Sequence, residues 1–387
     1  MLLIGAGLLL RSFVRLLSLD PGFRAAGALS FEIDLPEERL RQPAQVALYF
    51  QRVADRLRAL PGALAAGGIS ELPLAGVEAK GGVYIEGRPV PVKPEEVMIA
   101  HSPEIVPGYF QAMGIPLLRG RLIDAGDAAG KPLAAVIDEA MARAFWPGQD
   151  PLGARIRRAS YRKRGDDPAN PWYTVVGIVG TVRQSALEAE PYPEMYRTAA
   201  QTLPALARSY MVFVVRGRGP AASLASAARV AVREVERDQP IVKVRTLEQV
   251  AADSVARRRF SLMLLGLFAA LALALAAVGT YGVTSYSVAQ RTRELGLRMA
   301  LGARPGAVLG LVLGEAGALA VVGVALGVGA GFALARVISS LLYGVGSTDP
   351  LTFAAVALGL PLIALGAAYL PARRATEVDP MAALRAE

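Results

Sequence analysis

Apolar and charged positions divide the chain into a long mixed region followed by three apolar runs. The first run, from Phe260 to Gln290, contains no charged side chain. It exceeds the roughly 20 apolar residues that cross a bilayer as a helix. The pattern therefore predicts three membrane helices in the C-terminal third of the chain, at about 260–288, 306–338 and 351–371.

The start of the chain carries a shorter apolar run, residues 1–10, which is followed at once by Arg11 and Arg15. A signal peptide would place its positive charges before the apolar residues, so this run does not fit one. We expect residues 1–19 to form the outer part of a first membrane helix. An amphipathic helix at the membrane surface is the alternative.

The mixed region, residues 20–255, shows the periodicities of a soluble α+β domain. Residues 29–35 alternate as a half-buried strand does, and apolar residues at helical spacing predict a helix over 42–60. A strand and then a helix recur near its other end, at 211–215 and 221–235. We expect these two halves to pack as one unit, with a Gly- and Pro-rich, β-rich subdomain inserted between them.

Positive charge around the apolar runs predicts the orientation in the membrane. Four arginines lie between the first two runs, in 289–304, whereas Asp349 is the only charge in the loop 341–350. Because Lys and Arg are retained in cytoplasmic loops, the basic segment and the C-terminus are expected in the cytoplasm. The domain at 20–255 is then expected outside.

Composition excludes several classes of function. The chain has no Cys and one His, His101, so disulfides, thiol nucleophiles and multi-His metal sites are excluded. We expect no catalytic residue, metal or cofactor in this chain. The net charge of +9 fits cytoplasmic membrane edges better than a nucleic-acid partner, which we do not expect. His101 is interpreted as a satisfied surface or subdomain residue, and Trp146 and Trp172 as packing residues.

The segment RTRELGLRMALGA, at 291–303, predicts a short helix at the cytoplasmic surface. Arg291, Glu294 and Arg298 are three and four residues apart, so they share a helix face and can pair. Gly302 is placed to end the helix. From charge alone, a generic basic loop explains the segment equally well.

The second apolar run is rich in glycine and holds one carboxylate. Small residues four apart let membrane helices approach closely, and we predict helix packing at Gly310, Gly314, Gly323, Gly327 and Gly331. Glu315 is the carboxylate, and we favour a structural role for it over proton or substrate handling. In the outer domain, the basic run 155–164 is interpreted as an exposed hairpin or loop, with contact to lipid headgroups or a partner as the alternative.

Several segments together resemble the FtsX-like permease family, which includes MacB-like macrolide exporters and lipoprotein-releasing ABC transporter subunits. The two long motifs are RTRELGLRMALGA and PARRATEVDPMAALR, the latter at 371–385. Three outer segments, at 106–121, 136–153 and 172–184, resemble the MacB-like periplasmic core domain. The resemblance covers essentially the whole chain.

The resemblance implies a division into a partial first transmembrane helix (1–19), a periplasmic core domain (20–255) and an FtsX-like permease domain (256–387). It implies an ATPase-coupling helix containing Arg291, Thr292, Glu294, Leu295, Gly296, Arg298, Ala300, Leu301, Gly302 and Ala303. It also implies a C-terminal cytoplasmic motif containing Pro371, Arg373, Arg374, Asp379, Pro380, Leu384 and Arg385.

The function implied is that of an ABC transporter permease subunit in a bacterial inner membrane. It would couple ATP hydrolysis by a separate ATPase subunit to movement of the outer domain, for export of macrolide-like or lipoprotein-type substrates. The alternative is a transmembrane signalling subunit that regulates a cell-envelope enzyme. The expected partners are the ATPase, a second permease unit, membrane lipid and, as a further candidate, a periplasmic adaptor. The chain resembles the second unit of permeases that contain this unit twice, so we expect it to be part of a longer permease.

Overall fold

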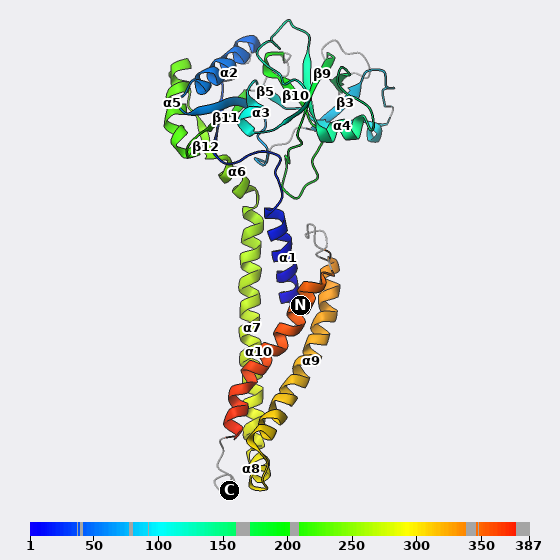
Figure 1. Cartoon of the computed structure of the whole chain (residues 1–387), viewed down its shortest axis with the longest axis vertical. Coiled ribbons are helices and arrows are strands. Elements are labelled where there is room, and N and C mark those ends of the chain that lie inside the picture. The colour runs from blue at the N-terminus through cyan, green and yellow to red at the C-terminus, as the bar shows by residue number, and fades with distance from the viewer. Residues whose placement is uncertain are drawn as a thin grey trace. The chain divides into compact units, whose positions relative to one another are not determined.

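The computed structural model describes residues 1–36, 38, 42–76, 80–91, 93–159, 171–201, 209–337, 346 and 348–376. The chain folds as two compact units (Figure 1). One is helical and comprises Met1–Ser18 and Arg257–Glu387, and the other, the outer domain, comprises Leu19–Ala256. Four residues of the predicted C-terminal motif lie outside the described residues, namely Asp379, Pro380, Leu384 and Arg385.

The outer domain contains one mixed sheet, to which twelve strands contribute in the described part of the chain. They are β1 (Ala28–Asp34), β2 (Ala63–Ile69), β3 (Lys80–Ile85), β4 (Met98–His101), β5 (Glu104–Val106), β6 (Leu117–Gly120), β7 (Ala134–Asp138), β8 (Arg155–Arg158), β9 (Tyr173–Val179), β10 (Met195–Thr198), β11 (Tyr210–Gly217) and β12 (Val242–Thr246). The helices of this domain are α2 (Pro43–Arg58), α3 (Tyr109–Met113), α4 (Glu139–Phe145), α5 (Leu224–Val235) and α6 (Leu247–Ser254). The observed α+β class is the predicted one.

The two ends of the outer domain form one layered half, as predicted. Its strands lie in the order β12-β1-β11-β2 and pair antiparallel, with α2 and α5 packed side by side on one face (Figure 1). Two strand–helix–strand units combined in this order are a ferredoxin-like arrangement. Phe31 and Phe213 stack on the face that α2 and α5 cover, and their ring centroids lie 5.8 Å apart. The period-2 alternation of β1 thus reflects one face buried under helices.

The inserted segment, from β3 to β10, extends the same sheet instead of forming a second one. Its strands continue beyond β2 in the order β5-β10-β7-β9-β8-β3-β4, and β6 pairs with β9. A separate core lies beneath them, where Met141, Phe145 and Trp146 pack against β7 and β9. Trp146 is therefore a packing residue, as the sequence indicated.

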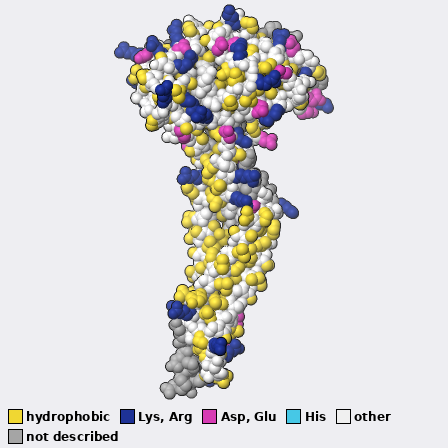
Figure 2. All heavy atoms as spheres, viewed as in Figure 1, with side chains coloured by type: hydrophobic (Ala, Val, Ile, Leu, Met, Phe, Trp, Pro, Cys, Tyr) yellow, Lys and Arg dark blue, Asp and Glu magenta, His cyan; other side chains and the backbone are white. Residues whose placement is uncertain are grey.

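The helical unit contains α1 (Leu2–Leu17), α7 (Ala256–Gln290), α8 (Thr292–Ala300), α9 (Pro305–Val337) and α10 (Pro350–Thr376). Within the described residues, three helices are long and apolar enough to cross a membrane, namely Arg258–Gln290, Pro305–Arg336 and Pro350–Thr376. Hydrophobic side chains cover their visible surface in Figure 2. The last helix continues beyond the predicted end at residue 371, because Ala372 and Ala375 are still buried against neighbouring helices.

The predicted partial helix at the start of the chain is α1, and it packs on α9 and α10. Ile4 and Leu8 are buried in a cluster with Ala335 of α9 and Phe353 of α10. Arg11 forms an ion pair with Asp349, the charge in the loop before α10. The pairing explains why a lone carboxylate stands in that apolar loop.

Candidate functional site

The predicted coupling helix forms as α8, and its two ends have identifiable causes. Arg291 breaks α7 from α8, and the Thr292 hydroxyl bonds the carbonyls of Val288 and Ala289 in the last turn of α7. At the other end Gly302 has φ +94°, and its N–H bonds the Met299 carbonyl. The next N–H, of Ala303, bonds the Arg298 carbonyl, which completes a Schellman motif. Gly302 therefore ends the helix, as predicted.

The inner face of α8 is an apolar anchor. Leu295 is buried in a cluster with Val308 of α9 and Ala375 of α10. Gly296, beside it, is buried as well. These residues of the predicted motif therefore hold the helix against α9 and α10.

The opposite face of α8 is exposed and mixes charge with leucine. Glu294 and Arg298 form an i,i+4 ion pair at 2.7 Å, with both side chains half exposed. Leu297 and Leu301 lie exposed beside them, Leu301 at 82%. Sequence analysis did not single out Leu297, although its i+4 spacing to Leu301 is the signal that could have identified it. We call Glu294, Leu297, Arg298 and Leu301 the coupling face.

Arg291 does not join that pairing, because its guanidinium contacts a carboxylate on α9. Its Nη1 lies 2.6 Å from Oε1 of Glu315. Glu315 is ten residues beyond the start of α9 at Pro305, which is about 15 Å along a helix. An unpaired carboxylate within a membrane segment costs about 3 kcal/mol or more, so a cationic partner accounts for this one. The pairing supports the structural interpretation of Glu315.

The five predicted packing glycines divide into two groups. A Cβ at Gly331 would lie 2.5 Å from Ile4 Cδ1, and one at Gly327 would lie 4.0 Å from the Met1 nitrogen, so these two face α1. Among the described atoms, nothing lies within 4 Å of a Cβ at Gly310, Gly314 or Gly323. Close packing to α1 therefore uses the C-terminal part of the stripe, at Gly327 and Gly331, and packing at Gly310, Gly314 and Gly323 stays a prediction.

The described part of the C-terminal motif lies in the last turns of α10. Pro371 is buried, and Arg374 donates to the Tyr281 hydroxyl of α7 at 3.1 Å. Because Ala375 packs in the same apolar cluster as Leu295, the C-terminal end of α10 contacts the buried face of α8. Arg373 and Arg374 therefore lie near α8, in the part of α10 that contacts the Leu295 cluster.

The basic run begins as one arm of a hairpin, one of its predicted forms, because β8 pairs antiparallel with β9, the next strand along the chain. Its first residues, Arg155–Arg158, form strand β8, and residues 160–164 lie outside the described residues. Arg157 is buried, and its guanidinium lies 4.4 Å from the Trp172 ring and 5.7 Å from the Tyr84 ring. Stacking on two aromatic rings offsets the cost of burying the cation, so Arg157, unlike Arg155, is not exposed as predicted.

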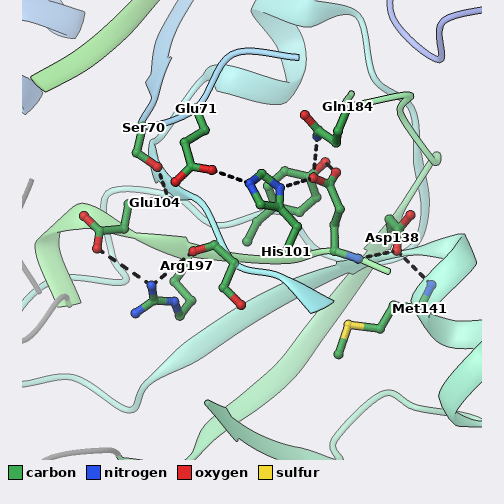
Figure 3. Close-up of polar contacts among 11 residues, drawn as sticks. Ser70, Glu71, His101, Glu104, Asp138, Met141, Gln184 and Arg197 are labelled. Carbon is green, nitrogen blue, oxygen red and sulfur yellow. Dashed lines mark hydrogen bonds and ion pairs between the residues drawn. The ribbon is translucent and has the colours of Figure 1, made fainter. Parts of the chain in front are cut away.

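His101 is the centre of a buried polar network in the outer domain (Figure 3). Its Nε2 lies 2.5 Å from Oε2 of Glu71, and its Nδ1 lies 2.7 Å from Oε1 of Glu194. Gln184 and Tyr196 also donate to Glu194. His101 is satisfied, as expected, but it is 1% exposed and so is not a surface residue.

Protonation of this network follows from its geometry. Each ring nitrogen of His101 faces a carboxylate oxygen, so both nitrogens donate when the ring is an imidazolium. Burial lowers the pKa of His101, but hydrogen bonds to Glu194 and Glu71 outweigh it and raise the pKa to about 9. Asp138 caps α4 by accepting from the Met141 N–H. Burial, together with the charge of Glu194, raises the pKa of Asp138 to about 7.

The network joins both halves of the outer domain. Glu71 follows β2 of the ferredoxin-like half, whereas His101 and Glu194 belong to the inserted half. Nearby, Ser70 exchanges hydrogen bonds with Glu104, and Arg197 lies 3.7 Å from the Glu104 carboxylate (Figure 3). Among the described residues, no group of three or more His, Asp or Glu side chains has the arrangement of a metal site.

Comparison with protein families matches both units of the chain. The model of the MacB-like periplasmic core domain matches residues 38–233, and that of the FtsX-like permease C-terminal region matches residues 266–380. The two matches fall on the outer domain and on the helical unit respectively.

Individual relatives are more distant. The macrolide export ATP-binding/permease protein MacB of Marinobacter nauticus is 27% identical over 309 residues, which cover 74% of this chain and 44% of that protein. The pyoverdine export ATP-binding/permease protein PvdT of Pseudomonas aeruginosa is 35% identical over 139 residues, covering 36% and 20%. The chain thus spans less than half the length of these curated relatives.

Among solved structures, the periplasmic region of MacB from Actinobacillus actinomycetemcomitans aligns with a TM-score of 0.39 and 12% identity, covering 61% of this chain and 95% of that one. The extracellular domain of YknZ from Gram-positive bacteria aligns with a TM-score of 0.33 and 15% identity, covering 53% and 93%. The family models match more than half of this chain between them. This protein therefore belongs to the MacB-like, FtsX-like family of ABC transporter permeases.

Proposed function

We propose that this chain is the permease subunit of an ABC exporter, and that it couples ATP hydrolysis on a separate ATPase subunit to movement of its extracytoplasmic domain. One observation carries the proposal, namely that α8 presents an exposed coupling face while its other face is anchored on α9 and α10. Such a helix can be pushed by a partner without being detached from the helices behind it.

Charge and leucine together suit the coupling face to a protein partner. Leu297 and Leu301 offer apolar area that is desolvated on docking, and the Glu294–Arg298 pair offers complementary charge at its edge. The proposed topology places this face in the cytoplasm, where ATP is available, and the outer domain beyond the membrane. A second permease unit completes the proposed assembly.

Export is the direction that the relatives support. MacB of Marinobacter nauticus and PvdT of Pseudomonas aeruginosa are both named as export ATP-binding/permease proteins. We infer from them an export function for this chain. The chemical class of the exported compound, macrolide-like or lipoprotein-type, stays part of the proposal.

Charge reversal on the coupling face tests the proposal. An exposed i,i+4 ion pair contributes only about 0.3–0.5 kcal/mol to stability, so Glu294→Lys should leave expression and melting temperature near the wild-type values. Like charges placed against a docked partner cost several kcal/mol. The tagged variant should therefore lose the ABC ATPase that co-purifies with the wild-type chain from its host and is identified by its P-loop sequence.

Glu139→Lys is the matched control. Glu139 also belongs to an exposed i,i+4 pair, with Arg143, but it lies on α4 of the outer domain. This variant should keep the ATPase and its ATP turnover. Wild-type levels of ATPase in the Glu294→Lys preparation would contradict the proposed docking face.

A further inference from the structure

The ion pair between Arg291 and Glu315 joins three elements of the helical unit. Arg291 separates α7 from α8, and its guanidinium crosses to α9. Its backbone N–H also bonds the carbonyls of Ser287 and Val288, so its Cα is held at the end of α7. The side chain therefore joins the start of the coupling helix to a position well inside α9.

A second attachment holds α8 on its other side. Leu295, one turn further along, is buried against Val308 and Ala375. Met299 packs against the same cluster, so this non-directional apolar contact covers the middle and the C-terminal end of the nine-residue helix. A charge-assisted hydrogen bond at 2.6 Å does have a direction, and it fixes the end of the helix that Leu295 leaves free.

The packing around α7 shows why a direct link between α8 and α9 is needed to move α9. An apolar hollow of about 190 Å³ lies between α7, α9 and α10, lined by small residues that include Ala276, Thr280, Gly323 and Ala364. Helices separated by a hollow have few interlocking side chains through which one displaces the other. A connection to α9 through Arg291 bypasses this gap.

We propose that Glu315 is a positioning residue, which holds the start of the coupling helix on α9 through Arg291 so that displacement of α8 moves α9 with it. The inference rests on the proposed function, in which a partner moves α8. It assigns Glu315 a role in transmission, because its carboxylate is already used by Arg291 and lies away from the coupling face.

The first experiment measures the position of α8 without any partner. The chain has no native Cys, so nitroxide labels at Leu301→Cys, directly after α8, and Leu319→Cys, on α9, report on these sites alone; both side chains are exposed. In lipid nanodiscs, the label-to-label distance should have one narrow distribution. Glu315→Gln should broaden and shift it, and the exchanged pair Arg291→Glu with Glu315→Arg should restore it. A distribution unchanged in Glu315→Gln, or still broad in the exchanged pair, overturns the inference.

The second experiment measures transmission in the complex with the co-purified ATPase. Glu315→Gln should retain the ATPase, while the stimulation of ATP turnover by the permease falls about tenfold, within the usual range of coupling between sites. The exchanged pair should recover it, because it restores the ion pair with the charges reversed. Full stimulation in Glu315→Gln overturns the inference. If no ATPase binds the wild-type chain, the proposed function fails, and the distance measurement still decides whether Glu315 positions α8.

Discussion

At the scale of single residues, the most constrained group is His101. Carboxylates of Glu71 and Glu194 face both ring nitrogens, and the side chains are almost completely buried. A buried charge is tolerated when it is paired and hydrogen-bonded, and this imidazolium has a partner on each side. Because Glu71 comes from one half of the outer domain and His101 from the other, the charge state of the ring bears on how firmly these halves are joined.

This arrangement predicts that the outer domain loses stability in alkaline solution. The folded-state pKa of about 9 lies above the ordinary value of 6.5, so the stabilising effect of His101 is fully present below about pH 6.5 and is lost as the pH rises through about 9. The total effect is on the order of 3 kcal/mol. Both Trp residues, Trp146 and Trp172, lie in this domain, so Trp fluorescence of the full chain in detergent reports its melting temperature.

Asp138 changes stability in the same direction but in a lower range. Its pKa is raised from 3.8 to about 7, so the folded domain favours the protonated acid and loses stability as the pH rises from about 4 to about 7. Melting temperatures between about pH 7.5 and about 9.5 therefore isolate His101. His101→Gln should be less stable at pH 7.5 and nearly flat across this range. A wild-type melting temperature that stays constant to pH 9.5 would contradict the ionised network.

At the scale of elements, α8 presents two leucines with opposite roles. Leu295 is 3% exposed in the apolar cluster, whereas Leu297 is 49% exposed on the coupling face. Leu295→Ala should lower the stability of the helical unit by about 2–4 kcal/mol, as truncation of a buried leucine does. Leu297→Ala should leave the melting temperature within about 1 °C of wild type and weaken ATPase binding.

The comparison of these two variants needs two measurements on the same preparations. Thermal melting in detergent, followed by helical circular dichroism, measures stability, and co-purification measures binding. Equal effects of Leu295→Ala and Leu297→Ala on melting would mean that α8 has no distinct anchored face.

At the scale of the whole molecule, the proposed topology places the coupling face and the outer domain on opposite sides of the membrane. Single Cys residues introduced into this Cys-free chain test it. Glu234→Cys, at an exposed position on α5, should react with an impermeant maleimide in intact cells, or in spheroplasts if an outer membrane blocks access. Leu301→Cys, on the coupling face, should react only after the inner membrane is permeabilised. Labelling of Leu301→Cys in sealed cells would show that the orientation is the reverse of the proposed one.

Much of the fold was predictable because its signals are local. Alternation identified β1, and helical spacing identified α2 and α5, since each element buries one face against the same core. The length of the apolar runs identified α7, α9 and α10, because a bilayer sets a minimum span. The contrast between these apolar runs and the mixed region before them also predicted the division of the chain into a helical unit and an outer domain.

Other features depend on which segments meet, and spacing along the chain does not contain that information. The glycines of α9 recur at one spacing along the sequence, but their surroundings differ, because Gly331 faces Ile4 and Gly323 faces a hollow. Continuation of one sheet through the inserted strands likewise depends on the pairing of β5 with β2.

By itself, the sequence determined the classes of element, the helices long enough to span a membrane, and the short helix in 291–303 with its glycine stop, because these depend on periodicity, length and local backbone conformation. Only the tertiary structure decided which charges pair. Arg291 has Glu294 and Arg298 as neighbours on its predicted face, but it pairs with Glu315, 24 residues away. Arg11 pairs with Asp349, 338 residues away. Ion pairs between distant segments form where packing brings opposite charges together, and that packing is a property of the folded chain.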